Sequence, residues 1–211
     1  MEIKYFVRTT GERQFDYSPL EYKVILDAKL KGTLSYIDAL RLANNYNSVI
    51  LEDDLVLCKN FQEEIEKVIN QYPTTIINFF TLPHTYYTTH FSESFSYNQC
   101  TYFPKGMTSE IANNMMKTIS GRRNQSYGAV LGFTLREMGI HHLIYRPNLV
   151  QHIDGKSVFQ RTDRFYMRNT IYFKDYLDEL GITMDEAFKK ENKNKLTKML
   201  EADRSKWYSK L

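Results

Sequence analysis

Short apolar blocks separated by polar turns recur along this chain and predict a series of buried strands. The first block, residues 3–8 (IKYFVR), precedes the polar turn TTGER and is typical of an opening strand. Further runs rich in β-branched and aromatic residues predict strands at positions 48–51, 75–81, 100–103 and 142–145. These runs alternate with helical patterns, so we expect an α/β fold in which helices pack on a sheet.

Amphipathic segments between and after the strands predict helices. They cover positions 34–46, 60–71, 108–119, 128–138, 163–178 and 184–205. In the first of them, Leu34, Ile37, Leu40 and Ala43 share the expected inner face, and Leu42 is a further candidate for it.

Two pairs of polar residues have the spacing of a capping box. Asn60 with Glu63 is expected to begin the second helix, and Thr183 with Glu186 the last one. A third such pattern is ambiguous. Residues 18–21 (SPLE) favour a helix start with proline at its first position, whereas the β-prone run YKVIL that follows favours a strand. We favour the strand.

Residues 83–99 carry five aromatic side chains among Thr, Ser and His without a helical period, which predicts a long loop. Long loops inside a compact domain are usually functional or mobile. A pair of adjacent histidines, His141 and His142, lies at a predicted turn from helix to strand. Adjacent residues there cannot share one face, so we expect both histidines to be structural.

Composition narrows the class of protein. The 211 residues are 42% hydrophobic and 25% charged, an ordinary globular balance with enough chain for a real core. No stretch approaches the roughly 20 apolar residues of a membrane span, and the N-terminus lacks the layout of a signal peptide. We therefore expect a soluble protein in the cytoplasm. Its two cysteines, Cys58 and Cys100, are expected to be reduced and structural.

The formal net charge of +3 is too small to indicate a nucleic-acid binder by itself. Basic residues are nevertheless concentrated near the C-terminus. They are Lys189, Lys190, Lys193, Lys195, Lys198, Arg204, Lys206 and Lys210. Such a stretch can contact phosphates or an anionic surface, but it is more often the solvated face of a helix.

Three adjacent acids, Glu52, Asp53 and Asp54, end the apolar run at positions 48–51. Because side chains alternate along a strand, Glu52 and Asp54 are expected to point one way and Asp53 the other. Carboxylates this close repel one another unless a cation lies between them, and a hard divalent cation relieves that repulsion. The alternative is an exposed acidic turn that caps the following helix, and the three acids alone do not decide between the two.

Two blocks of sequence resemble GT-A glycosyltransferases. Residues 32–61 contain LEDD in the place of that family's DxD-like motif, in a form similar to the N-acetylglucosaminyltransferase IV group. Residues 146–157 (RPNLVQHIDGKS) are similar to a late segment of the family. The resemblance covers roughly a fifth of the chain. It implies a GT-A-like, Rossmann-type mixed sheet in residues 1–160, followed by a helical extension over residues 161–211.

The same resemblance implies a metal site. Asp54 would bind manganese or magnesium as a catalytic ligand, and His152 would be a second metal ligand or contact the diphosphate. Glu52 would touch the ribose or a metal-bound water, with Asp53 nearby. An imidazole in a site of oxygen ligands favours manganese over magnesium.

Further residues are implied to bind the nucleotide-sugar donor. Lys156 and Ser157 would hold phosphate oxygens. Near the base we expect Arg8, Thr9, Thr10 and Asp27. The metal and a fixed cationic side chain would stabilise the charge that develops on the departing nucleoside diphosphate.

The chain departs from these relatives in one place. Many of them have an acid before the late segment in the phrase YDxxxG, whereas this chain has Tyr127 followed by Gly128. The general base is therefore unassigned. Asp154 and Glu93 are candidates by position alone, and a retaining reaction without such a base stays open.

Three classes of function follow. The first is sugar transfer to a hydroxyl acceptor, which is either a glycan or lipid-linked saccharide, or a hydroxymethylated base in DNA, as in the DNA-modifying glycosyltransferases of phages. A phage-encoded enzyme would act in the host cytoplasm. The second is a non-catalytic nucleic-acid or glycan binder that retains the fold. The third, a metal-dependent phosphotransferase or nuclease, would require further acids at neighbouring strand ends.

Overall fold

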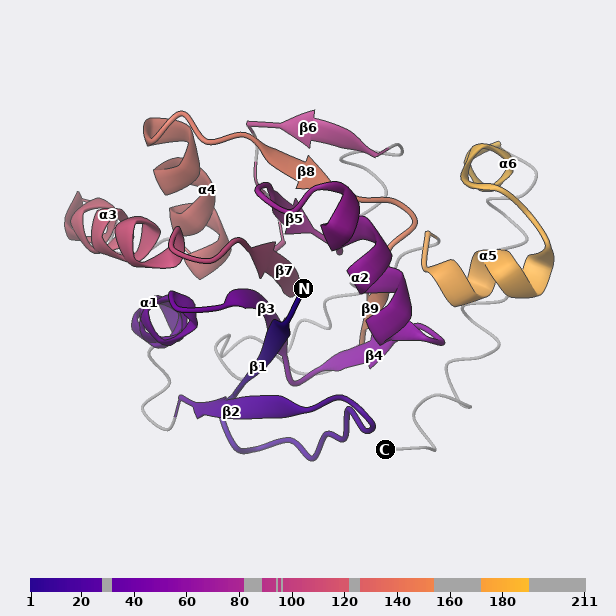
Figure 1. Cartoon of the computed structure of the whole chain (residues 1–211), viewed down its shortest axis with the longest axis horizontal. Helices are drawn as coiled ribbons and strands as arrows, with labels where there is room; N and C mark the ends of the chain where they lie inside the picture. The colour runs from indigo at the N-terminus through magenta and orange to yellow at the C-terminus, as the bar shows by residue number, and fades with distance from the viewer. Residues whose placement is uncertain are drawn as a thin grey trace, which may run out of the picture.

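The centre of the fold is a mixed sheet of seven strands in the order β2-β1-β3-β7-β5-β8-β6 (Figure 1). The computed structural model describes residues 1–27, 32–81, 89–93, 95, 97–121, 126–153 and 172–189. The strands of this sheet are β1 (Ile3–Thr9), β2 (Tyr22–Leu26), β3 (Asn47–Glu52), β5 (Ile76–Asn78), β6 (His90–Ser92), β7 (Cys100–Phe103) and β8 (His142–Ile144).

Strand direction decides which loops meet. β1 is parallel to both β2 and β3, and β5 is parallel to β8. β7 is antiparallel to its two neighbours, β3 and β5, and β6 is antiparallel to β8. The carboxyl ends of β1, β2, β3, β5 and β8 therefore lie at one edge of the sheet, which we call the carboxyl edge. In open α/β sheets this is the edge where ligands bind.

A second, two-stranded sheet extends from that edge. Its strands β4 (Leu55–Leu57) and β9 (Val150–His152) are antiparallel, and Leu55 is opposite His152. The backbone N–H of Ile153 also donates to the carbonyl of Asp54, at 2.8 Å. The late VQH segment thus runs alongside the chain that leaves the acidic cluster, although sequence pattern had not predicted a strand there.

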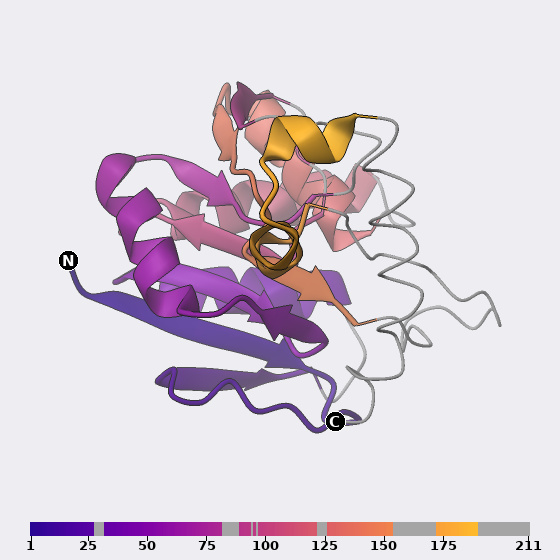
Figure 2. The same cartoon turned by 90° about the vertical axis from the view of Figure 1, so that its right-hand side faces the viewer.

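Helices cover both faces of the large sheet. On one face lie α1 (Gly32–Ala43), α3 (Thr108–Gly121) and α4 (Tyr127–Glu137), and on the other lie α2 (Phe61–Gln71), α5 (Lys174–Leu180) and α6 (Met184–Phe188). Figure 2 places α5 and α6 in front of the sheet with α3 and α4 behind it.

Alternation along the central strands divides the core in the same way. Val49 and Leu51 of β3 pack in the cluster beneath α2 and α5, whereas Ile50 packs in the cluster beneath α1, α3 and α4. All three side chains are buried. A strand between two helical layers has to be apolar on both faces, which explains why β3 reads as a continuous hydrophobic run.

The structure confirms the expected α/β class, with a mixed sheet between helices and a helical segment at residues 172–189. It also confirms the strand over residues 22–26, while residues 18–19 form a turn. In the described part of the long loop expected at residues 83–99, residues 90–92 form a strand, β6, which pairs with β8. Position 160, the expected domain boundary, lies outside the described residues, as do residues 163–171 and 190–205 of the two predicted C-terminal helices.

Two predictions about helices were wrong. Leu34 and Leu42 are exposed, at 38% and 47%, because the inner face of α1 is formed by Tyr36, Ile37, Ala39, Leu40 and Ala43. Asn60 does not cap α2 with its side chain. It has a left-handed backbone with φ 54° and makes no side-chain cap bond, while the N–H of the preceding residue, Lys59, donates to Asp175 of α5 at 3.0 Å.

The capping box of Thr183 and Glu186 is present as predicted at the start of α6. Cys58 and Cys100 are both free thiols, and burial raises the pKa of each. Within the described part of the chain, no helix combines the length and the hydropathy that crossing a membrane requires.

Candidate metal centre

The acidic cluster lies where β3 ends and the chain bends toward β4. Glu52 is the last residue of β3, and Asp53 and Asp54 form the bend. The hydroxyl of Tyr17 holds this bend by donating to the carbonyl of Glu52 at 2.6 Å and accepting from the N–H of Leu55 at 3.1 Å. Burial raises the pKa of Tyr17, so its hydroxyl keeps the proton it donates.

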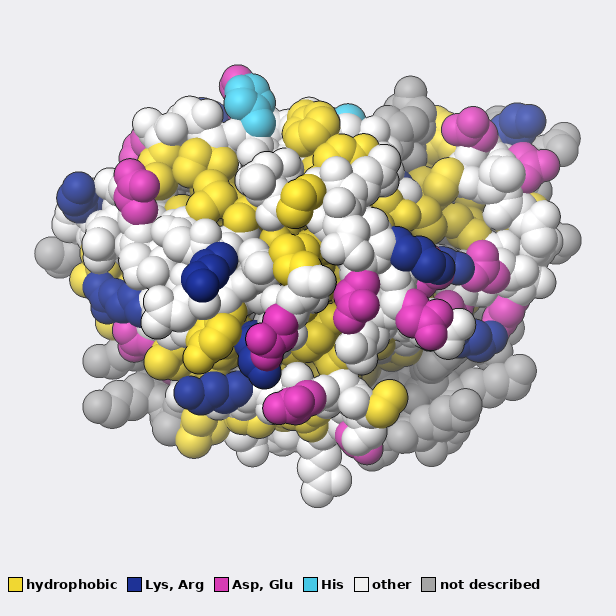
Figure 3. All heavy atoms as spheres, viewed as in Figure 1, with side chains coloured by type: hydrophobic (Ala, Val, Ile, Leu, Met, Phe, Trp, Pro, Cys, Tyr) yellow, Lys and Arg dark blue, Asp and Glu magenta, His cyan; other side chains and the backbone are white. Residues whose placement is uncertain are grey.

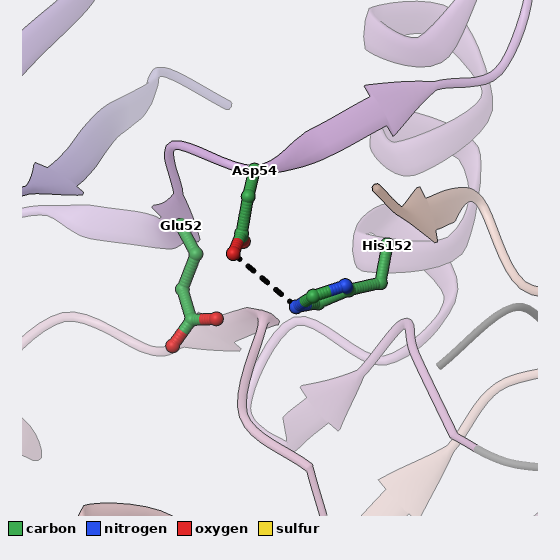
Figure 4. Close-up of side chains that lie close together, drawn as sticks. All are labelled: Glu52, Asp54 and His152. Atoms are coloured by element: carbon green, nitrogen blue, oxygen red, sulfur yellow. Dashed lines mark ion pairs between the residues drawn. The ribbon is translucent and has the colours of Figure 1, made fainter. Parts of the chain in front are cut away.

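Glu52, Asp54 and His152 converge on one point (Figure 4). Each offers a ligand atom, and these atoms lie within 4.8 Å of one another. His152 Nε2 is 3.3 Å from Asp54 Oδ2. All three residues are buried, with exposed fractions of 6–8%. The pairing of β4 with β9 is what carries His152 to the acids, because it fixes Leu55 opposite His152.

Burial excludes the alternative of an exposed acidic turn. Asp53 is 7% exposed and Asp54 8%, and the following helix begins only at Phe61. A buried carboxylate is costly unless it is paired or binds a cation, so a cluster of this kind needs compensating charge.

The expected alternation does not extend to Asp53 and Asp54, because both lie in the bend after β3 and one nitrogen of Arg13 contacts both carboxylates. Asp53 Oδ2 accepts from the hydroxyl of Thr9 at 2.5 Å, and its Oδ1 is 3.3 Å from Nη1 of Arg13. Asp53 therefore belongs to the support of the site and lies outside the group of three ligand atoms.

Arg13 is a site residue that sequence analysis missed. Its Nη1 donates to Asp54 Oδ2 at 2.6 Å, and the side chain is 28% exposed. It lies in the polar turn after β1, which the sequence presents only as a loop. Its position two residues after Gly11, at the carboxyl end of the first strand, was the available signal.

Arg8, expected near the nucleotide base, is buried next to Glu52. Its guanidinium donates to the carbonyl of Gly32 at 3.0 Å, and Nη1 is 3.9 Å from Glu52 Oε1. The rings of Tyr36 and Tyr127 lie 4.9 Å and 4.5 Å from its central carbon. Burial lowers the pKa of Arg8, and the negative charge of Glu52 opposes that shift.

Tyr127 is a second residue that the sequence did not reveal. From the first turn of α4 its hydroxyl donates to Glu52 Oε1. The next residue is Gly128, at the position where the GT-A phrase YDxxxG has an acid. A Cβ added at Gly128 would lie 3.0 Å from Asn98 Oδ1, so a larger side chain would have to displace Asn98. Asn98 thus takes the space beside Gly128.

The other expected donor-binding residues divide into two groups. Thr9 and Asp27 lie at the same edge as the acids, and the N–H of Asp27 donates to the carbonyl of Thr9 at 2.7 Å. Asp154, Lys156 and Ser157 lie outside the described residues. Their roles stay predictions.

Glu93 does not belong to this site. It follows β6, the strand at the far end of the sheet from β1 and β3, and its side chain is 67% exposed. There it pairs with His141, whose Nε2 is 3.4 Å away. The suggestion that Glu93 is the general base was therefore wrong.

Two carboxylates and an imidazole suit a divalent cation of the manganese type. The charges around them also favour one. Among the described residues, four buried carboxylates and two guanidinium groups gather here, and they belong to Asp27, Glu52, Asp53, Asp54, Arg8 and Arg13. Negative charge exceeds positive charge in this count by the charge of one divalent ion.

Comparison with known proteins assigns no family. No protein-family model matches the chain, and no curated protein matches its sequence. The resemblance to GT-A glycosyltransferases therefore rests on the two sequence blocks themselves.

Proposed function

We propose that this protein is a metal-dependent glycosyltransferase of the GT-A type, which transfers a sugar from a nucleotide-diphosphate donor to a hydroxyl acceptor. One observation carries the proposal. Asp54 and His152 come from the two blocks that resemble the family, and they meet at a single buried point. The blocks were recognised separately from sequence, so their meeting in space supports a shared role.

In this proposal Asp54 and His152 hold the cation, and Glu52 lies beside them as a further ligand or as a contact to bound water or ribose. A bound divalent cation neutralises the charge that forms on the leaving diphosphate. Arg8 adds a fixed positive charge behind Glu52, because its guanidinium is held by Gly32 and two tyrosine rings. Lys156 and Ser157 are proposed to bind phosphate oxygens, and Asp154 is the remaining candidate base.

The acceptor is proposed by its chemistry, a hydroxyl group, in either a glycan or a hydroxymethylated DNA base. On the face seen in Figure 3, described acidic and basic side chains are interspersed without a patch of one sign. DNA binding normally uses a basic patch. That face therefore offers no electrostatic reason to prefer DNA.

The competing functions have weaker support. A non-catalytic binder has no need for two buried acids that converge with an imidazole. A phosphotransferase or nuclease would use acids at several strand ends. Among the described residues Asp27 after β2 is one further buried acid at this edge, whereas β5 is followed by Phe79, Phe80 and Thr81, and β8 by Tyr145 and Arg146.

Thermal unfolding of the full chain with a panel of nucleotide sugars, with and without Mn²⁺, tests the proposal. A donor at a hundred times its Kd stabilises the fold by about 2.7 kcal/mol. We expect one nucleotide class to do so only with Mn²⁺, and to be hydrolysed slowly. The matched control for Asp54→Asn in this assay is Asp38→Asn, which removes an exposed carboxylate of α1 instead of one in the proposed centre. Stabilisation by no nucleotide sugar, with or without metal, contradicts the proposal.

A further inference from the structure

Two arginines contact the acidic cluster, and they are held very differently. Arg8 is 5% exposed and is fixed by the carbonyl of Gly32 and by the rings of Tyr36 and Tyr127. Arg13 reaches the acids from the turn after β1, and its side chain is 28% exposed. Arg8 is fixed within the core, whereas the side chain of Arg13 is partly exposed at the rim of the site.

Arg13 contacts the acids at an oxygen that belongs to the metal centre. Its Nη1 is 2.6 Å from Asp54 Oδ2, and that same oxygen is 3.3 Å from His152 Nε2. One carboxylate oxygen therefore faces both the imidazole and a guanidinium. The same Nη1 is 3.3 Å from Asp53 Oδ1, so the guanidinium bridges the two aspartates.

A divalent cation at Asp54 and a guanidinium at hydrogen-bond distance from the same carboxylate repel each other strongly. The repulsion is poorly screened because Asp54 and His152 are buried. Both cations also draw on the same negative charge. Occupancy by one must therefore weaken the binding of the other.

We propose that Arg13 competes with a divalent cation for Asp54, and that ion binding moves its guanidinium off Asp54 and leaves it on Asp53. This inference rests on the proposed metal centre and adds a regulating residue to it. Arg13 acts as an internal counter-ion that sets the affinity for the metal. It couples metal entry to movement of the turn after β1.

Asp53 is suited to receive the displaced guanidinium. It lies outside the three ligand groups, and Thr9 fixes its other oxygen at 2.5 Å. A guanidinium that pairs with Asp53 alone stays at the rim of the site with its remaining N–H groups available. An anionic donor that approaches the bound metal would meet them there.

Mn²⁺ binding to the full-length protein tests the inference without any activity assay. The electron paramagnetic resonance signal of free Mn²⁺ is lost on binding, so titration gives Kd directly. Low ionic strength keeps the electrostatic effect measurable. The variants are Arg13→Gln, which removes the charge, and Arg13→Lys, which keeps it. Arg41→Gln is the matched control, because Arg41 is an exposed arginine of α1 paired with Asp38.

We expect Arg13→Gln to bind Mn²⁺ more tightly than the wild type by about tenfold, since a competing positive charge is removed. Arg13→Lys and Arg41→Gln should stay within about twofold of the wild type, well inside the tenfold effect of a coupled charge. Equal Kd values in all four proteins overturn the competition but leave the metal centre standing. Absence of Mn²⁺ binding in all four overturns both.

Thermal unfolding supplies a second measurement. Without added metal, Arg13→Gln should unfold at a lower temperature than the wild type, because Asp53 and Asp54 lose a shared counter-ion. Saturating Mn²⁺ should raise its Tm by more than it raises the wild-type Tm. An identical metal-induced rise in both proteins contradicts the inference.

Discussion

The carboxyl edge of the sheet has two halves, and each buries an arginine against tyrosine. In the β1–β3 half, Arg8 lies beside Glu52 and two tyrosine rings. In the β5–β8 half, Arg146 lies 4.9 Å from the ring of Tyr172 and donates to the carbonyl of Thr81 and to Asn148 Oδ1, at 3.1 Å and 2.9 Å. The arginines are similarly buried, but their partners differ in charge.

That difference separates the proposed metal centre from a structural joint. Burial lowers the pKa of Arg8, and the carboxylates of Glu52, Asp27 and Asp53 oppose that shift. Burial also lowers the pKa of Arg146, to about 9, where Tyr172 rather than a carboxylate opposes it. Asn148 extends this second group by bonding to Tyr172 through its backbone N–H at 2.7 Å. Arg146 and Asn148 thereby attach the segment of α5 to the sheet.

Substitution of Asp54 in the β1–β3 half is the strongest test of this difference between the two halves. Asp54→Asn should abolish Mn²⁺ binding and lower metal-dependent turnover about a thousandfold, or ~4 kcal/mol in activation free energy. Its free energy of unfolding should change little, because the substitution also removes repulsion from Glu52 and Asp53. Mn²⁺ titration and urea unfolding measure the two effects. Retained turnover would count directly against the proposed centre.

Substitution of Arg146 in the β5–β8 half should have the opposite result, with a loss of stability and no loss of Mn²⁺ affinity. Arg146→Met removes the donor to Asn148 Oδ1 and one of the two donors to the carbonyl of Thr81, which Asn148 Nδ2 still contacts. It also removes a buried side chain, and should lower the free energy of unfolding by about 3 kcal/mol. Mn²⁺ affinity of the folded fraction should not change. Urea unfolding with Mn²⁺ titration at low denaturant measures both. A loss of Mn²⁺ affinity as large as that of Asp54→Asn would remove the distinction between the two halves.

His142 makes the stability of the β5–β8 half depend on pH. This β8 residue is fully buried against Phe95, at a ring distance of 4.7 Å, and burial lowers its pKa from 6.5 to about 4, with the charges of His90 and His141 acting in the same direction. A folded pKa below the unfolded value means that only the unfolded state takes up a proton between these values. Stability should therefore fall as pH drops from about 6.5 to about 4, by about 3 kcal/mol.

Urea unfolding at several pH values measures this loss. His142→Leu should remove most of the dependence in that window, whereas His141→Gln, at an exposed position, should retain it. An unchanged pH profile in His142→Leu would assign the dependence to other groups.

The smallest expected effect concerns the joint between α5 and α2. Asp175 accepts from the N–H of Lys59 through both carboxylate oxygens, at 3.0 Å and 3.1 Å. Asp175→Ala should cost about 1 kcal/mol of unfolding free energy, the usual net value of a lost hydrogen bond. The exposed Asp178→Ala is the control in the same urea experiment. Equal losses in both variants would mean that the contact with Lys59 contributes nothing specific.

Hydrophobic period was sufficient to predict most elements of the fold, because strands and helices bury their apolar side chains at fixed intervals. It failed at Leu34 and Leu42, where the neighbouring helices α3 and α4 rather than the period choose the buried face of α1. The capping-box spacing of Asn60 and Glu63 also failed, because Asn60 makes no side-chain cap bond and the residue before it is held by Asp175, far along the chain. Both errors are of one kind, since a local pattern does not specify its partner.

The acidic residues were evident from their types and order at the end of an apolar run, but that pattern did not decide between a metal site and an exposed turn. His152 entered the predicted site only through the resemblance of residues 146–157 to GT-A glycosyltransferases. The meeting of the acids with His152 depended on the antiparallel pairing of β4 with β9, which no local spacing encodes. Arg13 and Tyr127 joined the site for the same reason, from a turn and from a helix. The type of each residue determines which ligands it can bind. Which residues meet is determined only when the sheet assembles and brings the strand ends to one edge.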